Sequence, residues 1–142
     1  MMAKQQPVNK EQSFKNKVEG SKFLEENKKK KGVITLPSGL QYKVITEGTG
    51  SKPVLADKVT VHYRGKLIDG TVFDASYDRN EPATFGLTQV IKGWTEGLQQ
   101  MKAGGKYELY IPAELAYGDV GAGEKIGPGA VLIFEIELLK IN

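Results

Sequence analysis

Hydrophobic and polar residues alternate through much of the chain, and this period of two predicts β-strands. In the segment 58–64, three large apolar side chains alternate with polar neighbours, as expected for a strand with one buried face. The segments 40–46, 107–111 and 132–138 show the same alternation. An Asp69-Gly70 pair after the first of these segments predicts a two-residue hairpin loop. These segments therefore predict an antiparallel sheet.

One short segment has a helical period instead. Ile91, Trp94, Leu98 and Met101 are spaced by three and four residues, so they share one face of a helix. A sheet combined with one short helix predicts an α+β fold, in which a twisted antiparallel sheet of five to six strands wraps around the helix. Trp94 is either an ordinary core residue of this helix or the floor of a pocket, and periodicity alone leaves both interpretations open.

The first part of the chain has a different texture. Residues 1–9 are polar and are predicted to lack structure, whereas residues 10–30 suit a helix that ends at Gly32, with the lysines 28–31 in its last turn. A narrow apolar stripe on this helix predicts docking on the domain or on a second copy of the chain. The stripe consists of Phe14, Val18, Phe23 and Leu24.

Charge divides the 142 residues at the same place. Residues 1–31 hold nine lysines and four glutamates, a net charge of +5, and residues 32–142 carry a net charge of −2. We therefore divide the chain into a basic N-terminal extension (1–31) and one domain (32–142). A basic extension can touch nucleic acid or anionic lipid, but this one has no arginine, which favours a solvated helix and no nucleic-acid partner.

The sequence lacks the residues that several kinds of chemistry require. The chain has no cysteine and a single histidine, His62, which falls on the polar side of its strand and is expected at the surface. No Cys/His metal cluster, nucleophile elbow or phosphate-binding lysine motif occurs, so no metal or cofactor is predicted. There is also no apolar run long enough for a membrane span and no visible signal peptide. The absence of these motifs favours a site that binds its ligand over one that breaks covalent bonds.

Aromatic residues recur at the ends of predicted elements, next to glycine or aspartate. Tyr63 precedes Arg64-Gly65, Phe73 precedes Asp74, and Tyr117 precedes Gly118. Each residue alone is typical of a core. Together they suit a dry pocket with a few polar groups, which is the usual form of a site for a small ligand or a peptide.

Five ordered motifs identify a resemblance over about residues 35–142. They closely resemble the FKBP-type peptidyl-prolyl isomerases, and the segment 20–27 is similar to the lead-in of the bacterial branch that includes the macrophage infectivity potentiators. The motifs are Val61-His62-Tyr63-Arg64-Gly65, Asp69 to Ser76, Val90-Ile91-Lys92-Gly93-Trp94, Ala116-Tyr117-Gly118 and Leu132 to Leu139.

The resemblance implies catalysis of cis–trans rotation about Xaa-Pro bonds of proline-containing polypeptides, with no cofactor. It places Trp94 under the proline ring, Asp74 beside the twisting bond and paired with Arg79, and the Tyr117 hydroxyl and the Ile91 N–H on substrate carbonyls. The remaining residues that it implies form the walls and rim of the pocket. They are Tyr63, Phe73, Val90, Phe134 and, closing the rim from the glycine-rich loop, Ile126.

Three positions depart from the family's common pattern. Ala83 stands where many members have a pocket phenylalanine, Ala122 where a histidine is frequent, and Gly127 where a proline is frequent. The resemblance thus implies isomerase activity more firmly than binding of macrolides of the rapamycin type. Two other classes stay open: a holdase chaperone, and a scaffold that docks a partner through the N-terminal helix. We expect a monomer or a dimer formed through that helix, in the cytoplasm or the periplasm.

Overall fold

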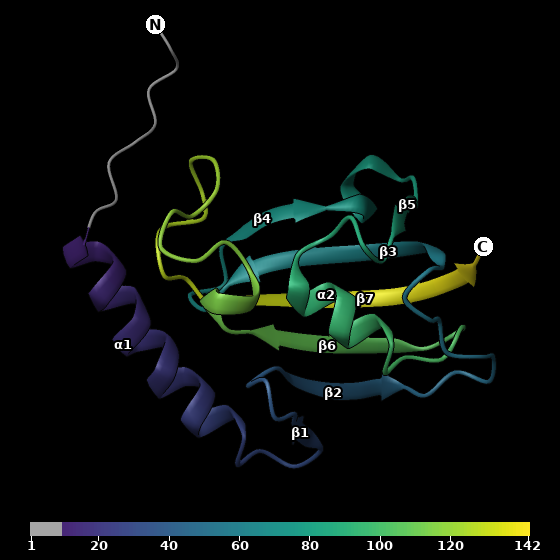
Figure 1. Cartoon of the computed structure of the whole chain (residues 1–142), viewed down its shortest axis with the longest axis horizontal. Coiled ribbons are helices and arrows are strands. Elements are labelled where there is room, and N and C mark those ends of the chain that lie inside the picture. The colour runs from purple at the N-terminus through teal and green to yellow at the C-terminus, as the bar shows by residue number, and fades with distance from the viewer. Residues whose placement is uncertain (1–9) are drawn as a thin grey trace, which may run out of the picture.

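A computed structural model describes residues 10–142, so the prediction for residues 1–9 lies outside the described part of the chain. Figure 1 shows a curved sheet with one short helix in front of it and a long helix, α1, beside one end of the strands. The helices are α1 (Lys10–Asn27) and α2 (Lys92–Leu98), with short 3₁₀ turns η1 (Ser76–Arg79) and η2 (Ala113–Leu115). The strands are β1 (Val33–Thr35), β2 (Gln41–Thr46), β3 (Lys58–Leu67), β4 (Val72–Ala75), β5 (Ala83–Gly86), β6 (Lys106–Ile111) and β7 (Leu132–Ile141).

All strands join one antiparallel sheet, which confirms the predicted α+β fold. Its order is β1-β2-β6-β7-β3-β4, with β5 paired to the other end of β3. The sheet has seven strands instead of five to six because β1 and β5, of three and four residues, are too short to show alternation. β3 and β7 form its centre and run side by side from Val59 opposite Ile141 to Leu67 opposite Leu132.

The hairpin between β3 and β4 forms where it was expected but with a longer loop. The loop spans residues 68–71, and the Gly70 N–H donates to the Leu67 carbonyl at 2.9 Å. Gly70 has φ 94°, a conformation that favours glycine. The Asp69 carboxylate accepts a hydrogen bond from the Thr71 N–H at 2.9 Å and so favours a turn wider than the predicted two residues.

Helix α2 packs closely on β6 through two glycines. A Cβ added at Gly93 would lie 2.5 Å from Cγ2 of Ile111, and one at Gly97 would lie 2.6 Å from Cδ1 of Leu109. Both partners are fully buried. The small residues therefore bring the helix, and with it Trp94, against the concave face of the sheet.

Only half of the predicted apolar stripe lies on the face of α1 that packs on the domain. Phe14 and Val18 are 70% and 51% exposed, whereas Ser13, Gly20 and Asn27 are buried at intervals of seven residues. Small and polar residues occupy the closest contacts, where the helix approaches the domain too closely for large side chains. Nearer the C-terminal end, Phe23 and Leu24 are half-buried, and the Phe23 ring lies 6.1 Å from that of Tyr110 on β6. The prediction that the helix docks is thus confirmed for this chain, and its predicted contact face is right for Phe23 and Leu24 but wrong for Phe14 and Val18.

The C-terminal end of α1 is also earlier than predicted. The helix ends at Asn27, whose buried side chain donates a hydrogen bond of 2.9 Å to Oε1 of Gln41 on β2. The Nε2 of Gln41 donates in turn to the Leu24 carbonyl at 3.0 Å. This buried amide pair fixes the helix end, and the lysines 28–31 lie in the following turn.

His62 is half-buried and not a free surface side chain. Its ring stacks on Tyr77, with centroids 4.7 Å apart, and its Nδ1 lies 2.8 Å from the hydroxyl of Ser76.

Within residues 10–142, no helix is long and apolar enough to cross a membrane.

Candidate binding and catalytic site

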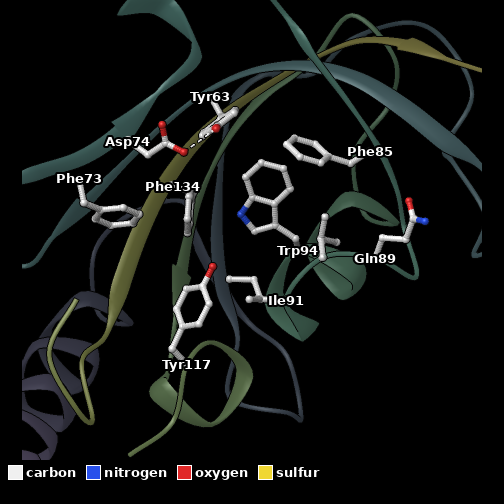
Figure 2. A pocket seen from close by; sticks show the side chains of 10 residues that line it. Tyr63, Phe73, Asp74, Phe85, Gln89, Ile91, Trp94, Tyr117 and Phe134 are labelled. Carbon is white, nitrogen blue, oxygen red and sulfur yellow. Dashed lines mark hydrogen bonds between the residues drawn. The ribbon is translucent and has the colours of Figure 1, made fainter. Parts of the chain in front are cut away.

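A cavity of about 450 Å³ opens between the concave face of the sheet, α2 and the loop that follows η2 (Figure 2). It receives side chains from β3, β4, β5, β7, the N-terminal end of α2 and that loop. Apolar and aromatic groups dominate the wall, and a carboxylate, an amide and two hydroxyl groups are the polar exceptions. The residues that line the cavity are Tyr63, Phe73, Asp74, Phe85, Gln89, Val90, Ile91, Trp94, Tyr117 and Phe134.

Trp94 forms the centre of the aromatic wall and is only 4% exposed. Three rings stand nearly perpendicular to its indole: Tyr63 at 5.2 Å, Phe85 at 5.4 Å and Phe134 at 5.2 Å between centroids, all at interplanar angles of 80° to 89°. Edge-to-face pairs of this kind hold the indole in one orientation. The indole is therefore both a core residue and the floor of the cavity.

The indole nitrogen has no partner within the protein. Among the described residues, it is the one buried side-chain nitrogen or oxygen without a hydrogen bond. In Figure 2 it points toward the space between Phe134, Ile91 and Tyr117. A buried donor without a partner is costly. The nitrogen has almost no accessible surface, so a ligand carbonyl could reach it only after a shift of the side chains around it.

Gly65 on β3 makes room for two of the rings. A Cβ at this position would lie 2.6 Å from Cζ of Phe73 and 2.7 Å from Cε1 of Phe134. These two rings meet edge to face, with centroids 5.5 Å apart. Gly65 does not have a positive φ, so its backbone conformation does not require a glycine. The packing of the two rings at the cavity requires it instead.

A polar network occupies one edge of the cavity. The Tyr63 hydroxyl donates to one carboxylate oxygen of Asp74 at 2.6 Å, and Arg79 donates to the other at 2.9 Å. Arg79 also donates to the Tyr63 hydroxyl at 3.0 Å. The predicted pairing of Asp74 with Arg79 is present, and Tyr63 joins it as a third member. The network fixes the carboxylate beside the aromatic wall.

Electrostatics keep this carboxylate ionised. Burial on its own would raise the pKa of Asp74, but the hydrogen bonds from Tyr63 and Arg79 and the Arg79 charge outweigh it, so that the pKa lies below its ordinary value. Burial, followed by the hydrogen bond to Asp74, raises the pKa of Tyr63. The site therefore presents an anionic carboxylate and a neutral phenol at neutral pH.

Tyr117 and Ile91 lie on the opposite side of the opening. Tyr117 is 41% exposed, and its hydroxyl points into the cavity toward Phe134 (Figure 2). Ile91 caps α2, and its carbonyl accepts from the N–H groups of Trp94 and Thr95 at 2.9 and 3.1 Å. The Ile91 N–H takes no part in the hydrogen bonds of the described backbone. The Tyr117 hydroxyl thus faces the cavity from this side.

The structure brings most of the expected residues together. Eight of them line the cavity, and Arg79 lies behind Asp74 in the polar network. Ile126 does not line it: the side chain is only 9% exposed within the core, and the backbone pairs with Ala122. The expectation that Ile126 closes the rim is therefore wrong in this structure, because the loop folds back on itself and turns that side chain inward.

Two lining residues were missed from the sequence. Phe85 reaches the cavity from β5, two residues after Ala83, and Gln89 lies in the turn before α2. Alternation along a strand would have put positions 83 and 85 on one face. Among the described residues, no three side chains of the His, Cys, Asp or Glu type lie close enough together to hold a metal ion.

Comparison with known proteins agrees with this geometry. The family model of the FKBP-type peptidyl-prolyl cis-trans isomerase matches residues 49–139, and the model of the domain amino-terminal to FKBP-type isomerases matches residues 1–44. The chain therefore belongs to the FKBP-type peptidyl-prolyl cis–trans isomerase family.

Two curated relatives illustrate how similar the chain is to its family. It is 51% identical over 142 residues to the outer membrane protein MIP of Legionella longbeachae, covering 100% of this chain and 61% of that protein. It is 58% identical over 123 residues to the FKBP-type 22 kDa peptidyl-prolyl cis-trans isomerase of Escherichia coli K12, covering 87% of this chain and 60% of that protein. The chain thus spans about three fifths of the length of these relatives.

Two solved structures have the same fold. FkpA from Escherichia coli superposes with a TM-score of 0.91 at 46% identity, over 94% of this chain and 62% of that one. A peptidyl-prolyl cis-trans isomerase from Pseudomonas syringae pv. tomato superposes with a TM-score of 0.84 at 40% identity, over 99% of each chain. The fold, including α1, is therefore shared with proteins of this family.

Proposed function

We propose that this chain accelerates cis–trans rotation of Xaa-Pro peptide bonds in polypeptides, by binding the twisted amide in the aromatic cavity. The observation that carries the proposal is the combination of a tryptophan floor, three perpendicular rings around it and one ionised carboxylate at the edge. Family membership supports the same activity.

The chemistry that such a site must perform is small. Rotation about the bond loses amide resonance, with a barrier of about 20 kcal/mol, and it forms or breaks no covalent bond. A catalyst needs only to bind the twisted amide more tightly than the planar forms. The twisted amide has less charge separation than the planar one, so an apolar cavity that excludes water favours it.

Each lining group has a role in this proposal. The proline ring rests on Trp94 between Phe73 and Phe134, and the Asp74 carboxylate lies beside the twisting bond. The Tyr117 hydroxyl and the Ile91 N–H hold carbonyls on either side. Weak donors fixed before substrate arrives need no reorganisation during the rotation.

The pH dependence follows from the state of Asp74. Because its pKa lies below the ordinary value of about 3.9, the carboxylate stays ionised until the pH falls below that value. The polar network stabilises the fold fully at pH values above the ordinary pKa of an aspartate. This stabilisation is lost as the pH falls through the lowered pKa of Asp74. We expect kcat/KM to stay level between about pH 5 and 8 and to fall below about pH 4. Stopped-flow assays across this range, with circular dichroism as a control for folding, measure the profile; a fall centred near pH 6 would contradict the assignment.

The substrates and ligands of the site are also proposals. Proline-containing segments of unfolded or flexible chains fit a cavity of this size and polarity. Macrolides of the rapamycin type are proposed as competitors for the same cavity, with affinity reduced because Ala83 offers no ring. Three further points stay predictions: the division at residue 32, a monomer or a dimer formed through α1, and a location in the cytoplasm or the periplasm.

Refolding of a model protein limited by proline isomerisation tests the proposed function. Catalytic amounts of the chain are expected to speed the slow phase in proportion to their concentration, and rapamycin is expected to suppress the effect. A holdase would instead need amounts equal to the refolding protein and would slow refolding. If the slow phase keeps its uncatalysed rate, the proposed function is wrong.

A further inference from the structure

The loop that brings Tyr117 to the cavity is held from within by a few backbone hydrogen bonds and by the buried side chain of Ile126. It runs from η2 to β7, and Gly118, Gly121, Gly123 and Gly129 all adopt positive φ. Its two ends are tied by one short hydrogen bond, from the Gly129 N–H to the Gly118 carbonyl at 2.7 Å. A loop rich in glycine pays a large entropic cost for a single conformation, so additional contacts matter for where its aromatic residue points.

Helix α1 supplies such contacts from its N-terminal half. The Ser13 hydroxyl donates to the Asp119 carboxylate at 2.9 Å, and the Lys17 ammonium forms an ion pair with it at 2.5 Å. The Asn16 side chain donates to the Pro128 carbonyl at 2.7 Å. These residues are spaced by three and four, so one face of the helix holds both ends of the loop. Figure 1 shows this end of α1 beside the loop.

Close packing accompanies the hydrogen bonds. Ser13 is only 5% exposed. A Cβ on Gly129 would lie 2.7 Å from the Ser13 carbonyl oxygen, and a Cβ on Gly20 would lie 2.6 Å from Cγ2 of Val131. The helix and the loop therefore fit so closely that neither glycine has space for a side chain. The buried Ser13 hydroxyl has its hydrogen-bond partner in the loop, as buried polar groups in folded proteins usually do.

The contact lies two residues from the cavity. Asp119 follows Tyr117 by two positions, and the Gly121 N–H donates to the Tyr117 carbonyl at 3.2 Å. The C-terminal half of α1 is anchored separately, through Asn27 and Gln41 on the sheet. Loss of the loop contacts would thus free the loop while the helix stays attached to the domain.

We infer that Ser13, Asn16 and Lys17 on α1 are positioning residues of the isomerase site, which hold the Tyr117 loop in the orientation that points its hydroxyl into the cavity. The inference rests on the proposed function for its catalytic consequence. Residues of α1 that do not line the cavity thereby determine the position of a side chain that does. The outward face of the same helix, with Phe14 and Val18, contributes nothing to this role.

A double variant, Ser13→Ala with Asn16→Ala, tests the inference, and Phe14→Ala with Val18→Ala on the exposed face is the matched control. Hydrogen exchange measures the loop independently of activity. We expect faster exchange of amides in residues 118–130 in the first variant only, and a fall in kcat/KM of about three- to tenfold. The control is expected to match wild type in both measurements.

Coupling to Tyr117 separates positioning from general stability. In a Tyr117→Phe background, which already lacks the hydroxyl, the same double substitution is expected to cost little further activity. Unchanged loop exchange would overturn the inference even if the wild-type chain is active. A full additional loss in the Tyr117→Phe background would overturn it as well. Should the double variant unfold, the exposed Lys17→Ala variant serves for the same exchange measurement. If the wild-type chain has no isomerase activity, the proposed function is wrong. The hydrogen-exchange experiment then still decides whether α1 holds the Tyr117 loop.

Discussion

Replacing Asp74 by alanine is expected to lower kcat/KM for a prolyl peptide about 10- to 100-fold without unfolding the protein. The carboxylate accepts hydrogen bonds from Tyr63 and Arg79 and is the anion of the described cavity wall. A hydrogen bond to a charged group contributes about 1.5–3 kcal/mol, and each 1.4 kcal/mol is about tenfold in rate. The loss should fall on activity because the side chain is 42% exposed and is not part of the core.

Asp78→Ala is the matched control for this substitution. Asp78 is an exposed carboxylate on η1, four residues further along the chain and outside the cavity. Stopped-flow assays with a proline-containing peptide should give wild-type rates for it. Equal rates for Asp74→Ala and Asp78→Ala would show that the carboxylate at the cavity does not take part in catalysis.

Replacing Phe134 by alanine is expected to have the largest effect on stability. The ring is 5% exposed and contacts the rings of Trp94, Tyr63 and Phe73 with centroids 5.2 to 6.4 Å apart. Removal of a buried phenylalanine ring costs about 3–5 kcal/mol. Because this ring also holds the Trp94 indole in place, we expect activity to be lost together with stability.

Urea denaturation measures this effect, with Leu139→Ala as the control on the same strand. Leu139 is 40% exposed, so its truncation should lower the free energy of unfolding by less than about 1 kcal/mol. If Phe134→Ala also lost less than about 1 kcal/mol, the ring would not be part of the packed wall that the structure describes.

Alternation and turn residues were sufficient to predict the longer strands of the sheet, and a spacing of three and four between apolar residues predicted the helix α2. The pattern around Tyr63 placed β3 correctly because one face of that strand is buried and the other is not. Strands β1 and β5 were invisible because three or four residues cannot establish a period. Phe85 was missed for the same reason, although it lies beside Trp94 in the cavity.

The N-terminal helix shows a different limit of sequence patterns. Phe14 and Val18 are apolar and correctly spaced, yet they face solvent, while Ser13 and Gly20 face the domain. Hydrophobicity predicts a contact face only where large side chains fill it. The N-terminal half of the helix packs by close approach and hydrogen bonds, and neither leaves a periodic apolar signal, whereas Phe23 in the C-terminal half packs on Tyr110. The role of α1 beside the Tyr117 loop therefore became visible only in three dimensions.

The central claim is that the aromatic cavity binds and twists prolyl bonds, and exchange NMR of an Ala-Leu-Pro-Phe peptide tests it most directly. With catalytic amounts of the wild-type chain, exchange cross-peaks between the cis and trans forms should appear within seconds, whereas the free peptide exchanges in tens of seconds or more. Addition of rapamycin should remove them and change the fluorescence of Trp94, the single tryptophan of the chain. Exchange at the uncatalysed rate in the presence of folded protein would contradict the account.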